Sequence, residues 1–161
     1  MLVTVFADAS WCPMQHVAGW SAWARSERGR TWAGDELRLL MPQAYLAEVC
    51  AVVRGVKMAL DAGVARTGDT LLVQSDCVQV DAVLWQRRLS EPGTDRHRVE
   101  TLARDVFRRL CDRFDLTCRF RHVKGHNGRA EGRRSFLNER CDAVAKRHMK
   151  SARTRLPAGA A

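Results

Sequence analysis

Four acidic residues lie where separate elements could carry them to one place. We expect Asp8 at the end of a first strand and Asp76 at the end of a buried strand, TLLVQS. Adjacent strands that both end in Asp would hold the two carboxylates ~5 Å apart, close enough to share a cation. Glu48 lies beside the apolar stripe of a predicted helix, and Asp142 lies on the last predicted helix.

Ligation by carboxylate oxygens alone indicates Mg²⁺ or Mn²⁺ rather than zinc. Two such ions, held ~3.5–4 Å apart, stabilise both the attacking and the leaving oxygen of a phosphodiester. Any one of these acids could equally be a surface carboxylate or a cap, since Asp is common in turns. The four acids together predict a metal-dependent site for phosphodiester hydrolysis.

The positive charge is confined to the C-terminal quarter of the chain. The 161 residues include 27 Lys and Arg against 18 Asp and Glu, a net charge of +9. Residues 119–155 hold 12 basic and 3 acidic residues and so account for all of it. A basic surface beside a neutral body is typical of proteins that bind a polyanion such as nucleic acid. The alternative is a solvated basic helix and tail without a partner.

Hydrophobic periodicity predicts one α/β domain over residues 1–150 and a flexible basic tail over 151–161. Strands are expected over 2–8, 17–25, 30–36, 70–75 and 115–123, helices over 42–62, 77–85, 97–113 and 137–149, and a loop over 124–135. This order is an antiparallel meander followed by crossover units. It predicts a five-stranded mixed sheet, with antiparallel and parallel strands, flanked by helices.

Composition excludes several other classes of protein. Hydrophobic residues make up 46% of the chain and charged residues 28%, as in ordinary globular domains. No uncharged stretch is long and apolar enough for a membrane span, and the first residues lack the pattern of a secretory signal. The six cysteines form no CxxC pair, so we expect reduced thiols in a cytoplasmic protein.

The segments that carry the acids resemble those of type 1 ribonuclease H, in the RNase H-like nuclease superfamily. In the family's order they are FADAS, AYLAEVCAVVRGVKMAL, LLVQSD, HVKGHNG and NERCDAVAKRHM. HVKGHNG followed by NERCD is the most specific part. The resemblance implies the RNase H-like fold and an endonuclease that hydrolyses the RNA strand of RNA–DNA hybrids with two Mg²⁺ ions, for which Mn²⁺ substitutes. We expect a monomer whose partner is the hybrid and not a membrane.

The resemblance also implies a role for each matched residue. Asp8 would bridge both ions, and Asp142 would help to hold the ion that activates the water. Glu48 and Asp76 would help to hold the ion at the leaving 3′ oxygen. His126 lies on a Gly-rich loop and, because histidine titrates near neutral pH, would assist proton movement or product release. An exposed loop histidine without a role is the alternative.

Several positions that touch the hybrid in the family differ here. Ala44 and Tyr45 stand where the family usually has asparagines, and Cys77 and Val78 stand where it often has Ser-Gln. Reading a 2′-hydroxyl needs a hydrogen-bonding group, which Ala44 and Val78 do not supply. The chain therefore lacks the family's side-chain contacts to the RNA at these positions.

A short segment, SEPGTDRHR, replaces the basic handle of some family members. We therefore expect substrate phosphates to be bound further along the chain, in the loop and the last helix. The residues predicted to bind substrate are Lys124, Arg129, Arg133, Arg134, Asn138 and Lys146. The alternative interpretation of the predicted loop that contains Arg129, Arg133 and Arg134 is an unstructured insertion.

Three other interpretations are open. A nuclease of the same fold that acts on DNA, such as a junction resolvase, is compatible with the altered 2′-hydroxyl contacts. A non-catalytic nucleic-acid-binding module is disfavoured because clustered carboxylates without metal repel one another, yet all four acids are present. A zinc site is disfavoured because no short Cys pair exists to start it. Its ligands would be Cys111, Cys118, His122 and His126.

Overall fold

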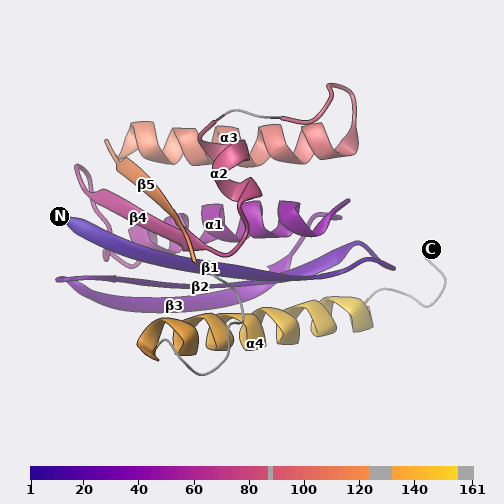
Figure 1. Ribbon diagram of the computed structural model, residues 1–161, viewed down its shortest axis with the longest axis horizontal. Helices are drawn as coiled ribbons and strands as arrows, with labels where there is room; N and C mark the ends of the chain where they lie inside the picture. The colour runs from indigo at the N-terminus through magenta and orange to yellow at the C-terminus, as the bar shows by residue number, and fades with distance from the viewer. Residues whose placement is uncertain (87–88, 124–131, 156–161) are drawn as a thin grey trace.

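The computed structural model describes residues 1–86, 89–123 and 132–155 of the chain (Figure 1). The strands of its sheet are β1 (Leu2–Cys12), β2 (Val17–Ser26), β3 (Gly29–Leu37), β4 (Thr70–Ser75) and β5 (Thr117–His122). The helices are α1 (Ala44–Asp61), α2 (Gln79–Leu84), α3 (Asp95–Arg113) and α4 (Gly132–Arg155). In this described part of the chain, no helix has the length and apolar character needed to cross a membrane.

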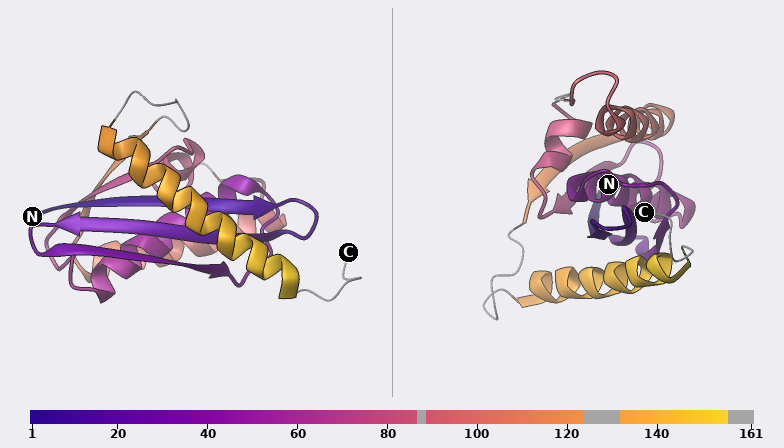
Figure 2. Two further views of the ribbon diagram at one scale, coloured as in Figure 1. Left: turned by 90° about the horizontal axis from the view of Figure 1, so that it is seen from below. Right: turned by 90° about the vertical axis from the view of Figure 1, so that its right-hand side faces the viewer.

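The five strands form one mixed sheet in the order β3-β2-β1-β4-β5. β1, β2 and β3 pair antiparallel, whereas β4 runs parallel to both β1 and β5. α1 covers one face of the sheet with α2 and α3 packed beyond it, and α4 covers the opposite face (Figures 1 and 2). The predicted five-stranded mixed sheet flanked by helices is confirmed.

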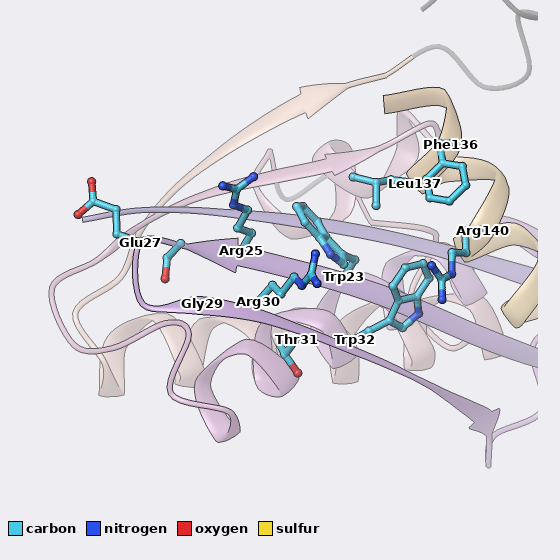
Figure 3. Close-up of a pocket in the computed structure, with 11 residues that line it drawn as sticks. Trp23, Arg25, Glu27, Gly29, Arg30, Thr31, Trp32, Phe136, Leu137 and Arg140 are labelled. Carbon is cyan, nitrogen blue, oxygen red and sulfur yellow. The ribbon is translucent and has the colours of Figure 1, made fainter. Parts of the chain in front are cut away.

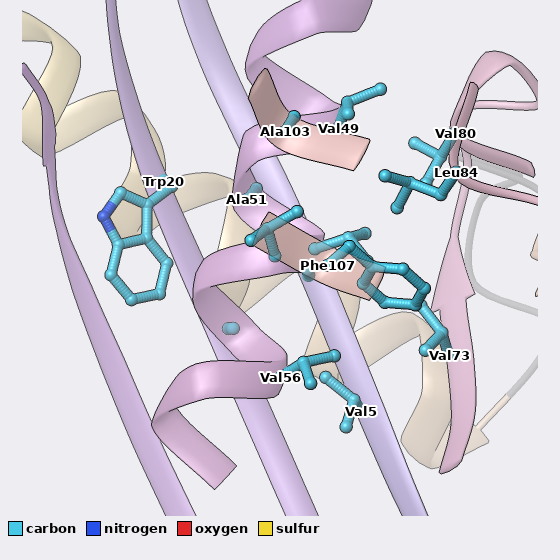
Figure 4. Packing of buried hydrophobic residues seen from close by; sticks show 14 of the residues in the cluster. Val5, Trp20, Val49, Ala51, Val56, Val73, Val80, Leu84, Ala103 and Phe107 are labelled. Atoms are coloured by element: carbon cyan, nitrogen blue, oxygen red, sulfur yellow. The ribbon is translucent and has the colours of Figure 1, made fainter. Parts of the chain in front are cut away.

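The main core lies between α1 and the sheet. Val49 and Val56, from the apolar stripe predicted for α1, are fully buried with Val5 of β1 and Val73 of β4 (Figure 4). Phe107 of α3 belongs to the same cluster and closes its outer side. Burying each such side chain contributes roughly 1.5–3 kcal/mol. This packing fixes α1, and with it Glu48, against the strands.

On the other face, a glycine in β2 lets α4 lie directly on the sheet. A Cβ atom at Gly19 would overlap the backbone of Ala145 and Met149. The close approach buries Cys141 completely, although its neighbour Asp142 stays partly accessible. α4 is therefore held where Asp142 faces the strand that carries Asp8.

The predicted bounds of two elements differ from the observed bounds by more than two residues. β1 does not end at Asp8 but runs on to Cys12, because residues 9–12 pair with residues 17–20 of β2 in a hairpin. α4 extends beyond the predicted range 137–149 at both ends, so residues 132–135 are helical rather than loop and residues 151–155 are helical rather than tail. Burial of Ala152 against Cys12 and Val17 accounts for the extension at the C-terminal end.

Candidate active site

Three of the four acids meet where β1 and β4 stop pairing. Asp8, Glu48 and Asp76 each place one carboxylate oxygen within 4.8 Å of the other two. The last paired residues of β1 and β4 are Phe6 and Gln74, so Asp8 and Asp76 occupy matching positions two residues further on. Glu48 reaches the same point from the second turn of α1. The expected juxtaposition of the two aspartates is present, although Asp8 lies within its strand.

Two of the three carboxylates, those of Asp8 and Glu48, stand in an environment that disfavours their charge. Burial, followed by repulsion from Asp76 and from Asp142, raises the pKa of Asp8 to about 7. Burial and repulsion from Asp8 raise the pKa of Glu48 well above its usual range. Oε2 of Glu48 is buried and has no hydrogen-bond partner among the described residues. An unpartnered buried carboxylate oxygen beside two further carboxylates fits a divalent cation with oxygen ligands.

Asp142 approaches the triad from α4 on the other face of the sheet. It is close enough for its charge to contribute to the raised pKa of Asp8. Its Oδ2 atom accepts a hydrogen bond from Nζ of Lys146 at 2.7 Å, one helical turn away, and its side chain is 19% exposed. In this arrangement Lys146, which the sequence analysis predicts to bind a substrate phosphate, neutralises the charge of Asp142.

The main chain at Asp76 is held by the end of β5. Nε2 of His122 lies 2.8 Å from the carbonyl oxygen of Asp76 and donates to it when the ring hydrogen is on that nitrogen. The amide of Val123 donates to the carbonyl oxygen of Ser75 at 3.0 Å. Sequence reasoning missed this role of His122. Its only signal was the position of the histidine at the end of β5, in register with Ser75.

Tyr45, one turn before Glu48, anchors the start of α1. Its hydroxyl donates to Oε1 of Glu100 at 2.6 Å, and Glu100 is only 2% exposed. The backbone amide and the hydroxyl of Ser90 donate to the same carboxylate at 2.6 and 2.9 Å. In the sequence, Tyr45 stands out only as a departure from the family. Here it ties the helix that carries Glu48 to α3 and to the segment before α3.

The other predicted site residues fall into two groups. Lys124, His126 and Arg129 lie outside the described residues. Arg133, Arg134 and Asn138 lie in α4, but their side chains are outside what the structure describes. Their predicted roles therefore stay predictions.

The described residues do not assemble the zinc alternative. Sγ of Cys111 and Sγ of Cys118 lie 3.5 Å apart, but His122 contacts the main chain of Asp76 and His126 is outside the described residues. Within the described part of the chain, the acidic triad is the one cluster of three or more His, Cys, Asp or Glu side chains with metal-binding spacing.

This sheet order, with three carboxylates clustered where β1 and β4 separate, defines an α/β protein whose acidic cluster has the spacing needed to hold a metal ion. The RNase H family model matches residues 2–150. The chain therefore belongs to the RNase H family and is a ribonuclease H. No curated protein sequence gives a significant match to it.

Solved structures share the fold at low sequence identity. RNase H1 from the archaeon Halobacterium salinarum is 20% identical, with a TM-score of 0.67 over 94% of this chain and 99% of that one. The N-terminal RNase H domain of a Mycobacterium tuberculosis protein is 16% identical, with a TM-score of 0.65 over 95% and 96%. LC11-RNase H1, solved in complex with an RNA/DNA hybrid, is 11% identical, with a TM-score of 0.59 over 93% and 98%.

Proposed function

We propose that this ribonuclease H hydrolyses the RNA strand of RNA–DNA hybrids with two Mg²⁺ ions, for which Mn²⁺ can substitute. The observation that carries the proposal is the triad of Asp8, Glu48 and Asp76 with its unpartnered buried oxygen. Family membership and a family-fold neighbour solved with an RNA/DNA hybrid support the choice of substrate. We also propose a cytoplasmic monomer, on the sequence alone.

Each acid would hold the cations from a different element. Asp8 is central because it lies next to Glu48 and Asp76 and also feels the charge of Asp142. When bound, two such cations supply stabilisation of the attacking and leaving oxygens of the phosphodiester. Asp142 becomes available when Lys146 releases its Oδ2 atom, and the lysine is then free to contact a phosphate. We assign proton movement or product release to His126.

Of all the features of the proposed function, the choice of RNA over DNA has the least support from side chains. Val78 is 58% exposed and Ala44 is also exposed, yet neither carries a group that could bind a 2′-hydroxyl. A nuclease of the same fold that cleaves structured DNA is therefore the second candidate, and it is favoured by these two residues specifically.

A cleavage assay with four substrates separates the two candidates. RNA–DNA hybrid, double-stranded RNA, double-stranded DNA and a four-way DNA junction, equal in length and each end-labelled, are incubated with the enzyme in Mg²⁺ and in Mn²⁺. We expect cleavage of the RNA strand of the hybrid, with much slower cleavage of the other three. Preferential cleavage of the junction would replace our proposal with the DNA-directed alternative.

A further inference from the structure

A second surface on the α4 face contains aromatic and basic side chains. α4 crosses the sheet diagonally and leaves one end of β2 and β3 uncovered (Figure 2, left). A groove of about 960 Å³ lies there, between the two strands and the first turns of α4 (Figure 3). Its lining includes Trp23, Arg25, Arg30, Trp32, Phe136 and Arg140.

The groove is continuous with the acidic site through the strand register. Asp8 pairs with Ser21 across β1 and β2, and the next pair on the same face is Phe6 with Trp23. Two residues along a strand span ~7 Å, so the groove begins about that distance from the Asp8–Ser21 pair. The indole of Trp32 donates to the hydroxyl of Ser21 at 3.0 Å, which links the two surfaces directly.

The aromatic side chains form a fixed platform. Trp23 contacts the ring of Phe6, with centroids 6.0 Å apart, and is paired with Trp32 across β2 and β3. The guanidinium of Arg140 lies 4.5 Å from the centre of the Trp32 ring. Phe136 of α4 is 58% exposed at the edge of the groove. One exposed ring and two half-buried rings beside guanidinium groups are suited to stacking on unpaired bases.

The positive charge of the groove favours an anionic ligand. Arg25 and Arg30 are directly opposed across β2 and β3, where like charges destabilise the pairing. Both are exposed, and neither forms an ion pair with any described residue. Glu27 is the acidic residue in the lining, against the three arginines 25, 30 and 140. A phosphate backbone would neutralise the opposed pair.

We propose that this groove binds a single-stranded extension of the nucleic acid whose duplex part occupies the acidic site. The stacking rings favour unpaired bases, the arginines favour phosphates, and the continuity with Asp8 favours a strand that continues from the site. The proposal rests on the proposed function, since it takes a nucleic acid to be bound at the acids. It adds a preference for hybrids that carry a single-stranded end.

The test compares binding of a blunt hybrid with binding of the same hybrid carrying a single-stranded end, 5′ in one version and 3′ in another. Fluorescence anisotropy in Ca²⁺, across a salt series, measures the affinity. We expect one of the tailed hybrids to bind about tenfold more tightly, the effect of about one stacked base. Arg25→Gln/Arg30→Gln should show a smaller preference for the tailed hybrid than the wild type, and its salt slope for the tailed hybrid should be lower by about 0.7 for each phosphate that it no longer neutralises.

Two further variants secure the interpretation. Arg54→Gln/Arg108→Gln removes the same charge from exposed positions on α1 and α3, across the sheet from the groove, and should keep the preference for the tailed hybrid. Phe136→Ala, at an exposed position, should reduce the preference without removing a charge.

The outcomes separate this proposal from the proposed function. Equal affinity of the wild type for all three hybrids, with normal cleavage of the blunt one, would overturn the groove proposal alone. A preference of unchanged size, with an unchanged salt slope, in Arg25→Gln/Arg30→Gln would also overturn it. An acidic peptide could instead bind to the wild type without being displaced by nucleic acid, and fail to bind to Arg25→Gln/Arg30→Gln. That result would assign the groove to a protein partner. Failure of the wild type to bind or cleave any hybrid would reject the proposed function.

Discussion

Nζ of Lys146 lies 2.7 Å from Oδ2 of Asp142, one turn apart on α4. The hydrogen bond and the charge of Asp142 raise the pKa of Lys146 above its usual value, so the lysine stays protonated. A predicted metal ligand and a predicted phosphate contact therefore neutralise each other in this structure. A cation that binds to Oδ2 of Asp142 would displace the lysine from it.

Removing this lysine should strengthen cation binding. Lys146→Gln eliminates a positive charge that competes for the oxygen of Asp142, and exposed pairs of this kind are worth about 0.2–1 kcal/mol. We expect up to about a fivefold lower Kd for Mg²⁺, measured by calorimetry. Arg147→Gln is the matched control, because it removes a charge from the neighbouring exposed position, and it should change the Kd much less. Equal effects of the two variants would show that only net charge matters.

Asp8→Asn should stabilise the protein in the absence of metal. The pKa of Asp8 is about 7 in the folded protein, against an ordinary value of 3.8. The folded state therefore holds an extra proton between these values, and the free energy of unfolding falls as the pH rises from about 4 to about 7, then levels off. The variant lacks this decline and should be more stable by about 2–4 kcal/mol at about pH 8.

Urea unfolding in EDTA at several pH values measures this effect. Added Mg²⁺ should stabilise the wild type at about pH 8, since a ligand that binds only the folded state raises its stability, and should stabilise Asp8→Asn far less. A variant that is less stable than the wild type at this pH would contradict the placement of Asp8 among repelling carboxylates.

Tyr45→Phe should loosen the start of α1. The buried carboxylate of Glu100 would lose its hydrogen bond from the Tyr45 hydroxyl, a change that costs about 1–3 kcal/mol when a buried acceptor loses its donor. Thermal unfolding of Tyr45→Phe, Glu100→Gln and the double variant measures the coupling between the two side chains. Additive effects would show that the contact contributes no stability of its own.

Arg129 and the two arginines in the first turn of α4, Arg133 and Arg134, should carry phosphate affinity. Arg129→Ala/Arg133→Ala/Arg134→Ala should weaken binding to every duplex by a similar factor, because phosphate contacts carry no sequence information. The slope of log K against log salt should fall by about 0.9 for each phosphate that the variant no longer binds, measured with a hybrid in Ca²⁺. Turnover at saturating substrate should change much less. Unchanged slopes would place the phosphate contacts elsewhere.

Local patterns predicted most of the fold. β4 has the bounds expected of it, 70–75, because its apolar run is bounded by turn residues on one side and Asp76 on the other. The apolar stripe of α1 also identified the buried face correctly, since Leu46, Val49 and Val56 are fully buried. The ends of α4 could not be predicted, because the burial of Ala152 depends on the distant hairpin at Cys12 and Val17.

The sequence predicted which acidic residues form the site, but it did not predict the residues that surround and position them. Asp8 and Asp76 could be placed together because parallel neighbouring strands bring equivalent positions side by side. The bond between Tyr45 and Glu100 joins residues 55 positions apart and leaves no periodic signal. The groove at Trp23 depends on the register of β2 with β3 and on the angle of α4, neither of which the sequence pattern specifies.

Cleavage of a hybrid by wild type and Asp8→Asn tests the central claim most directly. The hybrid is prepared twice, with the label on the RNA strand or on the DNA strand, and is incubated with Mg²⁺ or EDTA. We predict that the wild type cuts only the RNA strand and only with Mg²⁺, and that Asp8→Asn, folded by circular dichroism, cuts neither strand. Cleavage in EDTA, cleavage of the DNA strand, or activity retained by Asp8→Asn would contradict a ribonuclease H that works through cations held by these acids.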